Sequence, residues 1–338
     1  MRERAVISIL RALASPRLTL AGMALLGAAV VASHITPVAP AGWLLAALAL
    51  LALNLACALL SNARLRRGGL LVFHLALLGL VLLVGAGRLL RFDGRVEVVQ
   101  GSAFAAADAE TLRRGPLHPF RLQRVRFVQG PFSVDYAAGL NRSTTRSHVW
   151  VQAADGRWTP AEVGDDKPLL LEGYRFYTTS NKGFAPLITW TPTGGRPRSG
   201  TLNMPSYPLY EWNQKSRWTP PGGTGIAFEL HIKTNYSLHS GWALDGKSHQ
   251  TSLTLISANR RFDLKPGQAA RLPEGSLRFD ELRTWMGYGI FYDPTLPWLF
   301  AVAVTGVGGL VWHYWRNSAS CQPVARVVFS PNARRVTP

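Results

Sequence analysis

Residues 18–63 contain no charged side chain, and this run limits the folds open to the chain more than any other feature. A transmembrane helix needs roughly 20 consecutive apolar residues, so the run is long enough for two helices. Its interruption at 33–40 contains two prolines and several polar residues, which is typical of a tight connection. The sequence therefore predicts a hairpin of two transmembrane helices, at 18–34 and 42–60.

Two more uncharged runs, 68–87 and 294–315, are each long enough to cross a bilayer. They predict a third span at 69–90 and a fourth at 294–315. The arginines and apolar run at the N-terminus also resemble a signal peptide, but a second apolar run follows almost at once and favours a retained hairpin. The expected fold class is an integral membrane α-helical protein with four spans.

The net charge of +18 is divided unevenly along the chain. Residues 92–293 hold 24 of the 37 basic and 18 of the 19 acidic residues, a net of +6, so the remainder carries +12. Most of that excess lies in three places: an N-terminal arm at 1–17, the connection at 61–67 between the second and third predicted spans, and a tail at 316–338. Because cytoplasmic segments are enriched in Arg and Lys, both termini are predicted to be cytoplasmic. A basic excess that follows membrane topology argues against nucleic-acid binding.

Residues 91–293 are predicted to form a large, external all-β domain, inserted between spans three and four. Short segments of alternating polarity, separated by Gly and Pro clusters, are typical of strands and turns. The expected strands are 95–99, 120–128, 148–152, 169–179, 186–191, 226–234 and 251–257, with a long loop around 192–224. Many short strands favour a β-sandwich or an open barrel. Both cysteines, Cys57 and Cys321, lie outside this domain, so it contains no disulfide.

His74 is the candidate site residue that the sequence marks most clearly. It lies inside the uncharged run 68–87, where an ionisable side chain is costly enough to indicate a functional site. Imidazole is also an axial ligand of haem iron, so His74 is predicted to be a haem axial ligand. The alternative is a histidine that packs between helices and hydrogen-bonds across their interface.

Two further histidines are weaker candidates for haem binding. His313, near the cytoplasmic end of the fourth span, is on the same side as His74; it is a candidate second ligand or an interfacial histidine hydrated by headgroups. His34 lies at the opposite face, too far to share an iron with His74, and would serve a second, external site. The other histidines have no zinc-binding spacing and are expected to be ordinary residues: His118, His148, His231, His239 and His249. No catalytic residue is predicted.

Asn54 and Cys57 lie three residues apart on one face of the second predicted span. This spacing favours hydrogen bonding and small-residue packing between helices. A redox role for Cys57 would need a partner thiol, which the chain does not offer nearby.

Three segments in order resemble the ResB family of cytochrome c biogenesis proteins, of the System II pathway. The first is Asn54 to Cys57, which is similar to the family's Asn-Leu-x-x-Cys second span. The second is Phe73, His74 and the glycines that follow, and the third is the Gly287-Tyr-Gly-Ile-Phe-Tyr-Asp-Pro294 approach to the last span. The order of three spans, a β-rich domain and a closing span also matches. Thr295 stands where the family has Gly after Asp-Pro.

The resemblance implies a subunit of a cytochrome c maturation complex in the bacterial inner membrane, with its large domain on the periplasmic side. Such proteins work with a CcsA/ResC-type membrane partner to bind and export haem b and present it to apocytochrome c. By this resemblance His74 matches a histidine that shares haem with the partner. The chain lacks the partner's tryptophan-rich haem motif, so it is not expected to be a complete haem lyase.

Two other functions are open to a chain with these features. One is a membrane-tethered β-rich binding or sensor module without haem, which predicts that His74 is dispensable. The other is a quinone-linked b-type electron carrier, which would need two or four histidines inside the membrane. Only His74 lies clearly within a predicted span, which disfavours the electron carrier.

Overall fold

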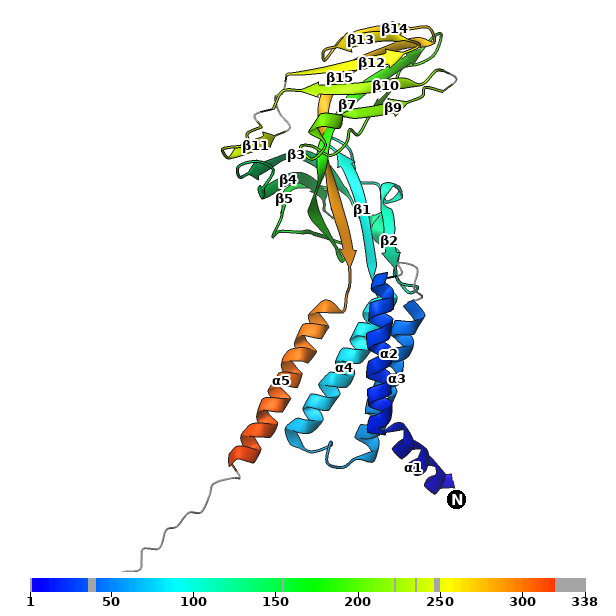
Figure 1. Ribbon diagram of the computed structural model, residues 1–338, viewed down its shortest axis with the longest axis vertical. Coiled ribbons are helices and arrows are strands. Elements are labelled where there is room, and N and C mark those ends of the chain that lie inside the picture. The colour runs from blue at the N-terminus through cyan, green and yellow to red at the C-terminus, as the bar shows by residue number, and fades with distance from the viewer. Residues whose placement is uncertain are drawn as a thin grey trace, which may run out of the picture. The chain divides into compact units, whose positions relative to one another are not determined.

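The computed structural model describes residues 2–35, 41–153, 155–221, 223–234, 236–245 and 250–319. The chain divides into a helical unit, Met1–Arg88 with Thr295–Pro338, and a β-rich unit, Leu89–Pro294 (Figure 1). The predicted connection at 36–40, His249 and most of the predicted tail, with Cys321, lie outside the described residues.

The helical unit consists of α1 (Arg2–Leu13), α2 (Pro16–Ile35), α3 (Ala41–Ser61), α4 (Gly68–Leu90) and α5 (Leu296–Ala319). The last four are each long and apolar enough to cross a membrane, as the uncharged runs predicted. The sequence did not predict α1, because 1–17 was interpreted only as a basic arm. Its 12 residues mix basic and apolar side chains and are too short to span a bilayer.

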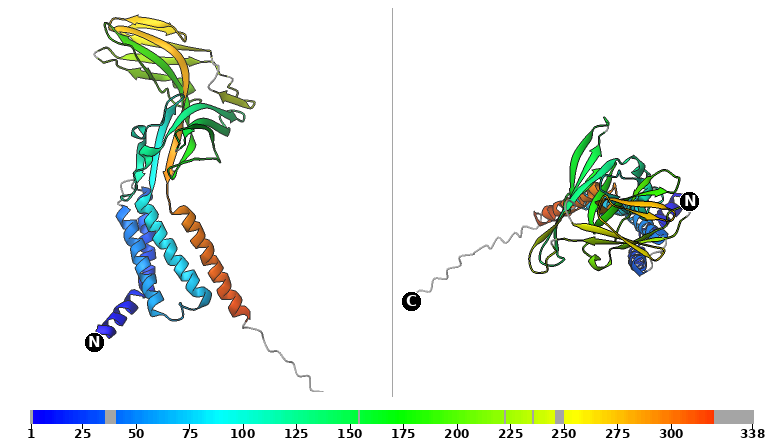
Figure 2. Two further views of the ribbon diagram at one scale, coloured as in Figure 1. Left: turned by 180° about the vertical axis from the view of Figure 1, so that it is seen from behind. Right: turned by 90° about the horizontal axis from the view of Figure 1, so that it is seen from above.

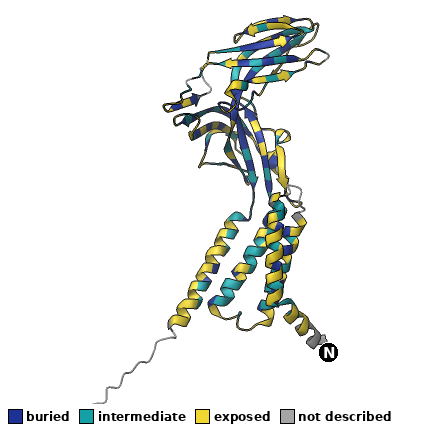
Figure 3. Ribbon diagram, viewed as in Figure 1, coloured by how far each residue is buried: buried dark blue, intermediate teal, exposed yellow. Residues whose placement is uncertain are grey.

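The membrane-length helices have many exposed residues (Figure 3), and large apolar side chains are among them. Exposed examples are Leu20, Met23, Leu75, Leu82, Phe300 and Val304. A helix that is hydrophobic on all sides is stable when apolar surroundings cover it, as lipid does for a membrane span. This exposure therefore fits the transmembrane interpretation of α2 to α5.

Three antiparallel sheets form the β-rich unit. The strands are β1 (Phe92–Val99), β2 (Glu110–Arg114), β3 (Phe127–Tyr136), β4 (Arg142–Gln152), β5 (Trp158–Gly164), β6 (Leu169–Leu171), β7 (Tyr174–Pro192), β8 (Arg198–Thr201), β9 (Lys215–Trp218), β10 (Ile226–Ile232), β11 (Trp242–Asp245), β12 (Thr251–Ser257), β13 (Arg260–Leu264), β14 (Ala269–Leu272) and β15 (Gly275–Tyr292). Their orders are β2-β1-β15-β7-β6 with β14 and β8 attached, β13-β12-β10-β9, and β11-β3-β4-β5.

Two long strands connect the parts of this unit. β7 and β15 pair antiparallel from Gly275↔Pro192 to Phe291↔Arg175, and β1 pairs with the other edge of β15. Figures 1 and 2 show β7 and β15 running from the β1 end of the unit to the sheet of β9, β10, β12 and β13. One hydrophobic core draws residues from all three sheets, including the fully buried Phe127, Phe184, Leu253 and Phe279.

The β-rich character is confirmed, whereas the predicted sandwich or open barrel is not: the described strands form three sheets and no closed barrel. Some of the predicted segment boundaries are wrong. The segment 120–128 contains a 3₁₀ turn, Leu122–Arg124, and joins β3 only at Phe127. The turn lets Leu122 and Val125 both reach the core, which a strand would place on opposite faces. The expected loop around 192–224 contains β8 and β9, and the segments 169–179 and 186–191 belong largely to the single strand β7.

Candidate functional site

His74 lies six residues after the start of α4, roughly 9 Å along the helix axis. Its ring is half-buried, and its Nδ1 lies 2.7 Å from the backbone oxygen of Leu70. A carbonyl oxygen can only accept a hydrogen bond, so Nδ1 carries the proton and donates it. The neighbouring Phe73 ring meets the imidazole edge-on, with 5.3 Å between the ring centroids.

This hydrogen bond determines which nitrogen of His74 is available to a ligand. With the proton on Nδ1, a neutral imidazole keeps a lone pair on Nε2. No hydrogen bond to Nε2 is present among the residues that the structure describes. Metal-bound histidines are commonly oriented in this way, with the other ring nitrogen donating to a backbone carbonyl. His74 therefore presents the tautomer that an axial ligand of haem needs.

Close packing through small residues joins α4 to α5 within the helical unit. A β-carbon at Gly69 would overlap the backbone of Gly309, and one at Gly306 would lie 3.0 Å from the β-carbon of Ala76. Small residues at these positions let the two backbones approach, as in many membrane helix pairs. Gly69 and Ala76 thus define the face of α4 that contacts α5.

His74 lies on a different face of α4. At 100° per residue it is about 140° around the helix from Gly69, on the same side as Leu78, Val81 and Gly85. A β-carbon at Gly85 would meet nothing within 4 Å, so the end of this face that lies roughly 16 Å from His74 has free space. His74, Leu78 and Val81 are themselves half-buried, and the available nitrogen of His74 on this apolar face suits haem that a second ligand from outside the chain would also hold.

The other two predicted ligands receive no support from the geometry. The backbone of His313 packs against Gly69, on the α5 side of α4, and its Nε2 lies 3.2 Å from Asn317 Nδ2. His34 is the penultimate residue of α2, and its side chain is outside the described part of the structure. Both assignments stay predictions. Among the described residues, no three His, Cys, Asp or Glu side chains gather to bind a metal ion.

Asn54 connects α3 to the junction between α1 and α2. Its side chain is buried, accepts a hydrogen bond from Thr19 Oγ1 at 2.7 Å, and donates to the backbone oxygens of Leu13 at 2.6 Å and Ser15 at 3.2 Å. The bond to Leu13 satisfies a carbonyl group at the end of α1, which a membrane environment would otherwise leave unpaired, whereas the Ser15 oxygen also accepts from the backbone N–H of Leu18. Asn54 therefore has the interhelical role that its spacing favoured, and Cys57 is buried nearby on the same helix.

A second site lies in the β-rich unit, where a polar hollow of about 850 Å³ borders β1. We call it the β1 hollow; its lining includes Glu97 of β1, Asp108 of the following loop, Thr179 and Asn181 of β7, and Gly287 of β15. The two oxygens of Glu97 accept hydrogen bonds from the amides of Asn181 and Asn203, each at 2.9 Å. These amides hold the carboxylate in one orientation at the hollow.

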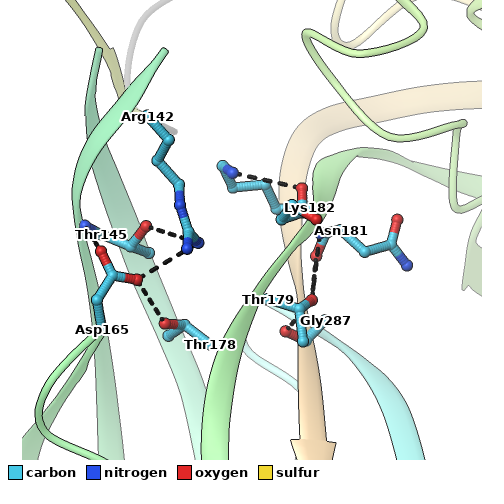
Figure 4. Close-up of polar contacts among 9 residues, drawn as sticks. Arg142, Thr145, Asp165, Thr178, Thr179, Asn181, Lys182 and Gly287 are labelled. Atoms are coloured by element: carbon cyan, nitrogen blue, oxygen red, sulfur yellow. Dashed lines mark hydrogen bonds and ion pairs between the residues drawn. The ribbon is translucent and has the colours of Figure 1, made fainter. Parts of the chain in front are cut away.

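A bulge between β7 and β15 shapes one wall of the β1 hollow. Their register shifts between Met286 and Tyr288, and Thr179 Oγ1 donates to the Gly287 oxygen at 2.8 Å (Figure 4). A β-carbon at Gly287 would lie 2.5 Å from the Asn181 oxygen, so only glycine fits here. Gly287 belongs to the segment that carried the family resemblance, and its structural role is to permit this bulge.

Lys182, directly after the bulge, is a buried cation with few partners. Its side chain points toward the cluster of Arg142 and Asp165 (Figure 4), and its Nζ lies 3.4 Å from the Ser180 oxygen. Its Nζ also lies 5.6 Å from the ring centre of Tyr136. Burial lowers the pKa of Lys182 to about 8, and the charge of Arg142 acts in the same direction. No sequence pattern marked Lys182, because it lies in the polar run 178–182.

Comparison with known families identifies the chain. A model of the ResB-like family matches residues 61–251, more than half of the sequence. The chain belongs to the ResB-like family. The family is associated with cytochrome c biogenesis and is a membrane family, which agrees with the four apolar helices. The match includes His74, whereas Asn54, Cys57 and the Gly287 segment lie outside it. No curated protein matches the chain.

Proposed function

We propose that this ResB-like protein binds haem b through His74, shared with a CcsA/ResC-type membrane partner. The pair would export the haem and present it to apocytochrome c. The observation that carries the proposal is the hydrogen bond from His74 Nδ1 to the Leu70 oxygen, which leaves Nε2 available for iron. Haem would supply the iron, and its vinyl groups would be the sites of attachment to the cytochrome.

The surroundings of His74 suit a large, flat and mostly apolar ligand. The face that carries His74, Leu78 and Val81 has no other ionisable side chain within the apolar part of α4, and Gly85 leaves space on it. This chain would offer one ligand for the iron on this face, His74, and a histidine of the partner would supply the other. The protein would thus hold haem without catalysing its oxidation chemistry.

The proposed orientation follows from the arginines. Both termini would lie in the cytoplasm and the β-rich unit on the periplasmic side of the bacterial inner membrane, because the basic excess is at 1–17, 61–67 and 316–338. His74, near the start of α4, would then lie close to the cytoplasmic surface.

The proposal is tested by measuring haem per protein with the reduced pyridine haemochrome spectrum. We expect wild type co-expressed with its partner to contain haem. The haem content per protein should fall at least tenfold in His74→Ala and stay as in wild type in His313→Ala. Adding imidazole to His74→Gly should restore part of the haem, because free imidazole can occupy the axial position.

Equal haem in wild type and His74→Ala would contradict the ligand assignment, as would absence of haem with the partner present. The remaining function would then be a membrane-tethered β-rich binding module without haem. The β1 hollow is the specific feature that favours this second candidate.

A further inference from the structure

One stretch of β1 has an unpaired edge. β1 pairs with β15 along its whole length, from Phe92↔Tyr292 to Val99↔Trp285. On its other edge β2 pairs only with the first half, from Phe92↔Arg114 to Arg95↔Glu110. Among the described strands, none pairs with this second edge over residues 96–99.

The hydrogen-bond pattern shows which backbone groups face this edge. The N–H of Gln100 donates to the Thr284 oxygen of β15 at 2.8 Å. In an antiparallel pair the direction alternates, so Glu97 and Val99 point their N–H and C=O groups away from β15. The Val99 oxygen accepts a turn hydrogen bond from Ser102 at 2.9 Å. The Glu97 N–H, the Glu97 C=O and the Val99 N–H therefore face the open edge.

The open edge borders the β1 hollow. Val96, Glu97, Val98 and Val99 all line it, and the loop after β1 contributes Asp108 to its lining. A neighbouring strand lies about 4.8 Å from its partner in the hydrogen-bonding direction. The hollow, about 850 Å³ in all, borders residues 96–99 at this edge and also extends over the sheet to Thr179 and Asn181 of β7, so an additional strand would occupy its β1 side, end to end with β2.

The charge of the hollow indicates which kind of strand fits. Three carboxylates line it, from Glu97, Asp108 and Glu110, with a single cation, Arg95. The chain as a whole carries +18, so this local excess of negative charge runs against its average. A segment with basic side chains is complementary to it, whereas a second copy of β1 would bring Glu97 against Glu97.

We infer that the β1 hollow binds an extended polypeptide segment with basic side chains, by strand addition to residues 96–99. Up to three backbone hydrogen bonds would give affinity irrespective of sequence, and the carboxylates would select basic side chains. This binding goes beyond the haem function and does not depend on His74, so either can fail without the other.

The inference is tested by measuring peptide binding with fluorescence anisotropy. Full-length protein in detergent is titrated against a fluorescein-labelled, unstructured peptide of alternating Lys and Thr. Val99→Pro removes one outward N–H from a position where an edge strand tolerates proline. We expect it to weaken binding at least tenfold. Val99→Ala, which loses similar side-chain packing but keeps the N–H, should change binding less than threefold.

A second arm separates strand addition from charge attraction alone. The same peptide, N-methylated at alternate residues, keeps its charges but loses backbone donors, and should bind at least tenfold more weakly to wild type. Glu97→Gln with Asp108→Asn should reduce the dependence of binding on salt. The inference would be overturned if the affinity for the peptide changed neither in Val99→Pro nor on N-methylation of the peptide. It would also be overturned if no binding occurred at millimolar peptide. A shift from dimer to monomer in Val99→Pro without peptide binding would also overturn it, and would make this edge an interface between copies.

Discussion

At the scale of single residues, a hydrogen bond sets the tautomer of His74, and burial lowers the pKa of Lys182. His74 gains its tautomer from one backbone oxygen a turn earlier in the same helix. Lys182 is 2% exposed, and its partners are a backbone oxygen and the face of an aromatic ring. The stacking of Tyr136 on Trp242, with centroids 4.3 Å apart, keeps that ring in place. Burial also raises the pKa of Tyr136 to about 12.

Because burial lowers the pKa of Lys182, we expect the stability of the β-rich unit to depend on pH. Its pKa is about 8 in the folded protein and 10.5 in the unfolded chain. Between these values the unfolded chain binds more protons, so the free energy of unfolding should rise with pH, by about 2 kcal/mol from pH 7 to 9.5. Tyr136 acts in the opposite direction only above pH 10, where the unfolded chain loses its phenol proton.

Lys182→Met should abolish this rise and stabilise the protein at pH 7, because it removes a poorly paired buried charge. The free energy of unfolding is measured by urea unfolding in detergent, followed by tryptophan fluorescence at pH 7, 8.5 and 9.5. Lys167→Met changes an exposed lysine of the same unit and should leave the pH dependence as in wild type. An unchanged slope in Lys182→Met would show that other groups cause it.

At the scale of elements, glycines decide where chains approach closely. Gly69, Gly306 and Gly309 let α4 and α5 pack, and Gly287 accommodates the bulge of β7 against β15. At Gly69, Gly309 and Gly287 a β-carbon would collide with backbone, which cannot move as a flexible side chain can, whereas at Gly306 it would press on the β-carbon of Ala76. The same reasoning separates glycines that are required from those that are not.

Gly287→Ala should destabilise the β-rich unit by about 1–3 kcal/mol, because its β-carbon would press on the Asn181 oxygen. Gly289→Ala is the matched control, since its β-carbon would meet only the Thr179 methyl group, at 3.8 Å. We expect a lower thermal midpoint for the first variant and a nearly unchanged one for the second. Equal midpoints would mean that the bulge can relax at little cost.

At the scale of the whole molecule, the four apolar helices and the arginine distribution predict that the chain's ends share one side of the membrane. Native Cys321 should then react with a membrane-impermeant maleimide only after cells are opened. A cysteine at the exposed position Leu170 should react in intact spheroplasts, and buried Cys57 should react in neither. Labelling of Cys321 in intact spheroplasts would reverse the proposed topology.

The sequence by itself determined the class of the molecule and its most informative histidine. Runs of uncharged residues predict membrane helices because lipid excludes charge over about 30 Å, whatever the tertiary structure. Alternation at 95–99 and 148–152 predicted strands correctly, since one face of each is buried. Asn54 was predicted to bond between helices because a polar side chain in a span needs a partner.

Only the tertiary structure decided features that depend on contacts between distant segments. The pairing of β7 with β15 and the bulge at Gly287 bring together residues more than 80 positions apart in sequence. The hydrogen bond from Asn181 to Glu97, beside the open edge at 96–99, does the same. Local pattern carries no information about such register, because each segment alone is compatible with several partners. Lys182 looked like any surface lysine for the same reason: its burial results from the packing of β7 against other strands, not from its neighbours in the chain.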